Sequence, residues 1–139
     1  MKIRHIKPKH ADFNAHMNLL KTAFDRVPSR KAEFLEMKRA VTECDASFYQ
    51  MSDGGGTVRL VSQIRDNTFF VWGMSGKGLV SVAPAIIERV SACGYSALEF
   101  VTYKPGMRRI LRGLGFVEVE RVNRSGGTET RHRLMIEGN

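Results

Sequence analysis

The stretch of sequence that decides the fold is Trp72–Phe116, which reads WGMSGKGLVSVAPAIIERVSACGYSALEFVTYKPGMRRILRGLGF. It begins at a strand end with a glycine loop over Ser75–Val80, and an apolar-periodic run then predicts a helix over about Val82–Ala92. An alternating run predicts a strand over Ser96–Tyr103, and Met107–Leu114 predicts a short helix. A glycine loop before a helix can cradle phosphates, because its amides are unpaired and the helix dipole favours anions. The stretch therefore predicts a phosphate-binding corner within a strand–helix–strand unit.

The segments on either side of this stretch predict two further helices and six further strands. Apolar residues recur at helical spacing after Asp12 and again after Ser29, so a helix is expected at each place. The strands are expected at Met1–Lys7, Ala46–Met51, Thr57–Ile64, Thr68–Gly73, Phe116–Val122 and Thr130–Ile136. The order βααβββαβαββ predicts an α/β fold (an α+β mixed sheet) with helices on both faces of a central sheet.

Composition favours one globular domain over residues 1–139. The chain is 42% hydrophobic and 26% charged, which is ordinary for a domain that forms its core without metals or disulfides. The formal net charge of +8 favours anionic partners, although an inert basic surface gives the same balance. Cys44 and Cys93 are isolated and the histidines fit no zinc spacing, so buried thiols and no metal site are expected. No apolar stretch is long enough to span a bilayer, which predicts a cytoplasmic protein.

The element order and three short motifs resemble the GCN5-related N-acetyltransferase (GNAT) superfamily. Ile3-Arg4 followed by Asp12 is similar to the usual opening of such proteins. Ser75–Val80 stands where the superfamily has its Arg/Gln-x-x-Gly-x-Gly/Ala pyrophosphate loop, and Leu114-Gly115-Phe116 stands where its last helix ends in Leu-Gly-Phe. The resemblance covers nearly the whole chain and implies a central mixed sheet whose two middle parallel strands splay apart.

The resemblance implies a place for acetyl-CoA between the two splayed strands. Phe70 and Trp72 would lie on the strand that contacts pantetheine. The pyrophosphate loop would consist of Ser75, Gly76, Lys77, Gly78, Leu79 and Val80. Ser75, Val80 and Leu111 depart from the superfamily pattern, Leu111 standing where a tyrosine often protonates the departing thiolate. The alternative is an ordinary strand-to-helix turn whose glycines only permit a positive φ.

The chemistry of acetyl transfer points to Tyr103 and Glu99 as candidate catalytic residues. Transfer to an amine needs a base for the amine and an acid for the thiolate. Tyr103 ends the strand after the crossover, and Glu99 lies four residues earlier on the same face. We interpret them as acid and base. The alternatives are a strand-end tyrosine with its hydroxyl in water and a solvated carboxylate.

A basic cluster on or before the last helix is a second candidate site. It consists of Lys104, Arg108, Arg109 and Arg112. Such residues can hold the phosphates of coenzyme A, DNA or RNA without reading base sequence. The alternative is a solvated face of a basic protein.

Two hypotheses about function follow. The first is an acyl-CoA-dependent N-acyltransferase that acetylates an amine of a small molecule or protein. The second is a catalytically silent relative of the same fold, used as a binding or assembly protein. The resemblance extends to bacteriophage products, for which the second hypothesis means a particle-associated or nucleic-acid-contacting protein in the host cytoplasm or virion. Either hypothesis is compatible with a homo-oligomer.

Overall fold

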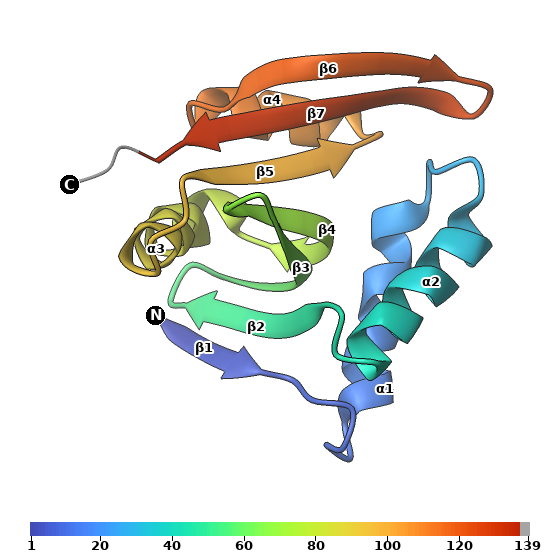
Figure 1. Ribbon diagram of the computed structural model, residues 1–139, viewed down its shortest axis with the longest axis vertical. Helices are drawn as coiled ribbons and strands as arrows, with labels where there is room; N and C mark the ends of the chain where they lie inside the picture. Colours follow the sequence, from blue (N-terminus) through green and yellow to red (C-terminus); the bar gives the residue numbers. More distant parts are fainter. Residues whose placement is uncertain (137–139) are drawn as a thin grey trace.

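In the computed structural model, which describes residues 1–136, seven strands form one mixed sheet in the order β1-β2-β3-β4-β5-β7-β6 (Figure 1). The strands are β1 (Lys2–His5), β2 (Ser47–Asp53), β3 (Gly56–Arg65), β4 (Thr68–Lys77), β5 (Ala97–Thr102), β6 (Val117–Arg124) and β7 (Gly127–Met135). The helices are α1 (Phe13–Asn18), α2 (Arg30–Thr42), α3 (Leu79–Ala92) and α4 (Pro105–Gly113), with a 3-10 helix, η1 (Leu19–Phe24), after α1. The predicted element order is confirmed.

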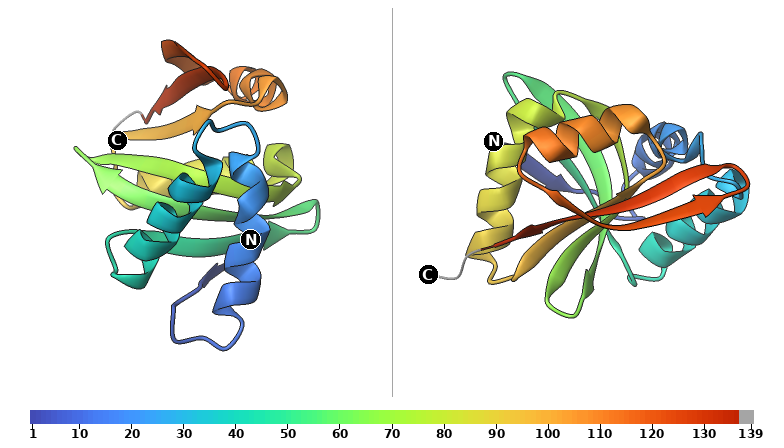
Figure 2. Two further views of the ribbon diagram at one scale, coloured as in Figure 1. Left: turned by 90° about the vertical axis from the view of Figure 1, so that its right-hand side faces the viewer. Right: turned by 90° about the horizontal axis from the view of Figure 1, so that it is seen from above.

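The helices cover both faces of the sheet, as Figures 1 and 2 show, and each face has its own core. On one face, α1, η1 and α2 bury residues such as Met17, Leu20 and Met37 against Phe48 and Val61. On the other face, α3 packs on β2, β3 and β5, and α4 packs on β6 and β7. That second core includes Leu60, Val71, Ile86, Leu98, Phe100 and Leu111. Alternating strand residues supply the two cores, because neighbouring side chains point to opposite faces.

The pairing of β4 with β5 is parallel, as predicted, and it is short. It runs from Thr68 opposite Ala97 to Val71 opposite Phe100 and then stops. On its other side, β4 pairs with β3, and the register of this pairing shifts next to Val71. Val61 pairs with Gly73, whereas the next residue, Ser62, pairs with Val71. Trp72 is therefore the extra residue of a β-bulge, which bends a strand and increases its twist. The bulge coincides with the separation of β4 from β5, so the parallel strands splay beyond Val71.

The predicted loop over Ser75–Val80 is wrong as a conformation. Strand β4 continues to Lys77, paired with β3 up to Thr57, and Gly78 alone joins it to α3. Helix α3 begins at Leu79, three residues before the predicted start, and contains Pro84 in its interior. The Pro84 ring is exposed, so it lies on solvent rather than on the sheet.

Close backbone packing explains why this corner is rich in glycine. Gly76 has a φ of +124° and Gly78 a φ of +85°. An added Cβ at Gly76 would lie 2.2 Å from the Thr57 carbonyl oxygen, and one at Gly78 would lie 2.5 Å from the Gly55 carbonyl oxygen. Both glycines thus let the end of β4 pass against the β2–β3 hairpin.

Two smaller predictions are also corrected. The helix expected after Asp12 divides into α1 and η1, although Leu20 and Phe24 still face the core. Cys44 and Cys93 are exposed rather than buried, because each follows the end of a helix at the surface.

We expect Gly76→Ala to lower the free energy of unfolding by about 2–4 kcal/mol, because the substitution combines steric overlap with a left-handed φ. Urea unfolding measures the effect. Gly54→Ala is the matched control, since an added Cβ there meets nothing within 4 Å and the change should be below about 0.5 kcal/mol. Equal effects of the two substitutions would contradict the close contact.

Candidate functional site

The splay between β4 and β5 forms a cleft on the face that carries α1, η1 and α2. This cleft has a volume of about 260 Å³, and a smaller hollow of about 50 Å³ lies next to it. The residues that line both are Ala23, Trp72, Val101 and Thr102. Trp72 and Val101 flank the point at which pairing of the two strands ends. The hollow and the cleft therefore meet at the gap between the parallel strands.

Phe70 and Trp72, predicted to lie on the pantetheine strand, both line the cleft. Two guanidinium groups lie over the Phe70 ring, with the Cζ of Arg65 4.0 Å and that of Arg131 5.7 Å from the ring centroid. The floor of the cleft is thus aromatic, and its wall at the start of β4 is positively charged.

Tyr103, the predicted acid, also lines the cleft, and its hydroxyl donates a hydrogen bond of 2.6 Å to Glu129 Oε2. Burial, followed by the hydrogen bond and charge of Glu129, raises the pKa of Tyr103 to about 12. The phenol therefore stays protonated through the neutral range. Glu33, from the first turn of α2, adds a second carboxylate to this end of the cleft.

Glu99, the predicted base, is nearly inaccessible. Its side chain is 5% exposed and forms ion pairs with Arg131 and Arg133, the latter at 2.7 Å. Burial alone would raise the pKa of the carboxyl, but the hydrogen bonds and charges of the two arginines outweigh it and lower the pKa. Among residues 1–136, those that line the cleft do not include Glu99. Its geometry is that of a structural ion pair beneath the cleft.

The turn between β4 and α3, where a diphosphate was predicted to bind, is short and lies next to the carboxylate of Asp53. Ser81 and Val82 donate their amides to the Gly78 carbonyl, so Leu79 and Val80 carry the unpaired donors of the helix start. The Asp53 carboxylate accepts hydrogen bonds from the Ser81 hydroxyl at 3.0 Å and from the Gly55 amide at 2.7 Å.

The Gly55 bond contributes most to a lowered pKa of Asp53, so the group is charged at neutral pH. The unpaired edges of β4 and β5 beyond Val71 fit an acyl-pantetheine arm. The negative charge of Asp53, however, opposes the binding of a diphosphate at the start of α3.

The predicted basic cluster is divided in the structure. Lys104 donates from Nζ to the Thr22 carbonyl at 2.7 Å, so it bridges α4 and η1. Arg108 donates to the Thr130 hydroxyl at 3.1 Å and to the Thr128 carbonyl, so its guanidinium is directed at β7. Arg109 and Arg112 are exposed on α4. The side chain of Leu111, beside them in sequence, is fully buried.

Some functional groups of the cleft were not identified from the sequence. Glu129 and Arg131 alternate on β7 with the same parity, but that pattern does not show which strand they face. Arg65 ends a strand at a turn, where an arginine is usually solvated. Among residues 1–136, no group of three or more metal-ligating side chains occurs, and no helix is long and apolar enough to cross a membrane.

The fold is that of GCN5-related N-acetyltransferases. The structure is similar to the ribosomal-protein-S18-alanine N-acetyltransferase from Escherichia coli, with a TM-score of 0.69 and 14% identity over 99% of this chain and 95% of that one. It is also similar to a Bacillus subtilis acetyltransferase in complex with CoA, with a TM-score of 0.61 and 17% identity over 98% and 99%. A third similar structure is that of the yncA protein from Salmonella typhimurium with its cofactor acetyl-CoA. Its TM-score is 0.60, and the identity is 15% over 100% of this chain and 95% of that one. In sequence, no protein family and no curated protein matches the chain.

We expect Glu99→Gln to lower the free energy of unfolding at pH 7 by about 1–3 kcal/mol, because two partly exposed arginines lose their carboxylate. The folded-state pKa of Glu99 lies below its ordinary value of 4.5. Its ionic contribution is therefore complete above about pH 4.5 and is lost as the pH falls through the folded-state pKa. Urea unfolding of both proteins should show a stability gap that narrows between pH 7 and pH 3, and a gap independent of pH would contradict an ionic origin.

Proposed function

We propose that the chain is an acyl-CoA-dependent N-acyltransferase that transfers an acetyl group to an amine of a small molecule or protein. The observation that supports this most is the split of β4 from β5 at the Trp72 bulge, which leaves the facing strand edges unpaired beside a cleft. Unpaired backbone donors and acceptors bind an extended amide chain in the way a further strand would. A pantetheine arm is such a chain.

The cleft and the hollow suit the two substrates of this reaction. The donor would lie along β4, with its thioester at Trp72 and Val101 and its diphosphate near Lys77 and the Leu79 amide. The acceptor would occupy the cleft, which combines an aromatic floor with the carboxylate of Glu129. A carboxylate recognises the ammonium form of an amine and can take its proton.

Acetyl-CoA supplies the activated acyl group, so that a C–N bond forms at the carbonyl carbon and the C–S bond breaks. Glu129 takes one proton from the ammonium group and leaves a neutral nucleophile. Once protonated, Glu129 is a weaker acceptor, so the Tyr103 hydroxyl can turn to the departing sulfur. The second proton of the nitrogen then passes through Tyr103 to the sulfur, and the first returns from Glu129 to solvent. Glu129 replaces Glu99 as the base in this assignment, since Glu99 lies beneath Arg131.

A second function, that of a catalytically silent binding or assembly protein, is favoured by one observation. The turn between β4 and α3 is reduced to Gly78, and Asp53 places a negative charge where a diphosphate would approach. Two like charges in one site disfavour each other. The two functions differ in whether coenzyme A binds and whether its thiol is released.

Thiol release from acetyl-CoA with a panel of primary amines tests the proposal. We expect amine-dependent release by the wild-type protein and a fall in kcat of about 10- to 100-fold in Tyr103→Phe, with KM for acetyl-CoA changed less than about twofold. Tyr95→Phe, a change on the far side of the sheet, is the matched control and should retain full activity. No release with any amine would favour the silent alternative.

Replacing Asp53 by Asn should tighten coenzyme A binding about three- to tenfold, because it removes a negative charge from the start of α3 and keeps a hydrogen-bond acceptor. Calorimetric titration measures the affinity. Glu88→Gln, farther along the same helix, makes the same change in charge and should leave the affinity unaltered. An unchanged affinity in Asp53→Asn would place the diphosphate away from α3.

A further inference from the structure

We infer that the acceptor amine carries an anionic group, a carboxylate or phosphate, and that Arg65 is the residue that binds it. This inference rests on the proposed function, because it names the class of acceptor that the cleft would take. It follows from the position of Arg65, from its lack of an ion-pair partner and from the separation of charge along the cleft.

Arg65 is held in one orientation at the wall of the cleft. Its guanidinium carbon lies 4.0 Å from the centre of the Phe70 ring. Its Nε and one terminal nitrogen donate to Gln63 Oε1 at 3.1 and 2.5 Å. Stacking and a two-point hydrogen bond fix the plane of the group, and a fixed guanidinium loses less conformational entropy when it binds a carboxylate.

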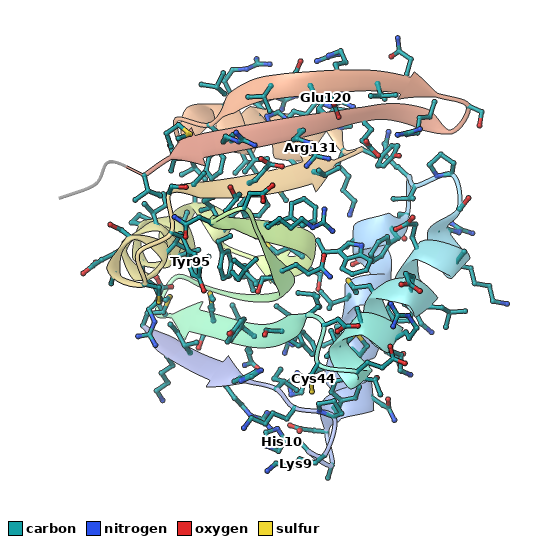
Figure 3. The ribbon with its side chains drawn as sticks, viewed as in Figure 1. Lys9, His10, Cys44, Tyr95, Glu120 and Arg131 are labelled. Atoms are coloured by element: carbon teal, nitrogen blue, oxygen red, sulfur yellow. The ribbon has the colours of Figure 1, made fainter. Side chains whose placement is uncertain are left out.

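The charge of Arg65 has no carboxylate partner within residues 1–136. The neighbouring Arg131 pairs with Glu99 and lies 3.7 Å from Glu120 of β6 (Figure 3), whereas no acidic side chain lies within ion-pair distance of Arg65. Burial, followed by the repulsion of Arg131, lowers the pKa of Arg65, and the more distant charge of Glu99 offsets this only in part. An anion beside Arg65 would offset both effects.

The opposite end of the cleft is acidic. Glu33 and Glu129 line it beyond the end of β4–β5 pairing, whereas Arg65 and Arg131 line it beside Phe70. A ligand whose ammonium group lies at Glu129 and whose anionic group lies at Arg65 is complementary in charge to both ends of the cleft. Phe70 lies two residues before Trp72, where the transfer would occur, so amine and anion would be separated by about 7 Å at the strand rise.

An acceptor of this length is a dipeptide with a free amine and a free carboxylate, since two extended residues span about 7 Å. Glycylglycine and glycylglycine amide are therefore a matched pair of probes that differ only in the anionic group. Phosphoethanolamine and ethanolamine form a second pair, with a phosphate and a shorter span. Acetyl-CoA-dependent acetylation of each is measured as kcat/KM.

For the wild-type protein we expect a kcat/KM for glycylglycine about tenfold or more above that for its amide, the range for a hydrogen-bonded charge pair. Arg65→Gln should abolish this preference, and Arg65→Lys should retain part of it. A preference for phosphoethanolamine over ethanolamine larger than the glycylglycine preference would assign the anion as a phosphate. Arg89→Gln, an exposed arginine on α3 across the sheet, is the control and should keep the wild-type preference.

Trp72 is the only tryptophan of the chain and lines the cleft, so its fluorescence reports on acceptor binding without catalysis. Glycylglycine should alter the emission with about tenfold higher affinity than the amide, and Arg65→Gln should remove the difference. Equal rates and affinities for charged and neutral acceptors in wild-type protein would overturn the inference while the proposed function stands. Absence of acetylation and of any fluorescence response with all probes would overturn both.

Discussion

The end of pairing between β4 and β5 is the constraint on which the rest of the structure depends. Parallel strands normally continue side by side, but the extra residue Trp72 bends β4 away just after Val71. The bend leaves unpaired backbone groups at a surface, which is costly unless water or a ligand satisfies them. It also opens the cleft into which Phe70 and Tyr103 project. The single bulge residue Trp72 thus ends the pairing of β4 with β5 and opens the cleft in which the proposed chemistry would occur.

The β2–β3 hairpin imposes a second constraint, at the start of α3. Because β4 stays paired with β3 as far as Lys77, Gly78 must turn the chain into the helix within one residue. The hairpin also brings Asp53 to Ser81. The glycines that the sequence offers as a phosphate cradle therefore serve backbone packing, and a diphosphate there would meet a carboxylate. The connection between β4 and α3 is where the structure departs most from the sequence prediction.

Much of the fold was predictable from the sequence, because period-2 and period-3.6 patterns are local. The strand–helix–strand order around α3 follows from such patterns, whereas the parallel pairing of β4 with β5 was implied by the resemblance to the GNAT superfamily. The extension of β4 through Ser75–Lys77 was not predictable, since glycine is rare in strands and only the contact with Thr57 explains Gly76. Two residues predicted for the site, Trp72 on β4 and Tyr103 directly after β5, line the cleft. Glu129 was not predicted because its contact with Tyr103 joins segments distant in the sequence, and Arg65 was not predicted because an arginine at a strand end is usually solvated.

Amide hydrogen exchange along β4 tests most directly whether the split receives an acyl-CoA. Unpaired amides exchange quickly, and a bound pantetheine chain would protect them. Saturating acetyl-CoA should slow exchange in a peptide that covers residues 72–78, with no change in the β6–β7 hairpin. No slowing in residues 72–78 at saturation, or slowing confined to α4, would contradict binding in the split.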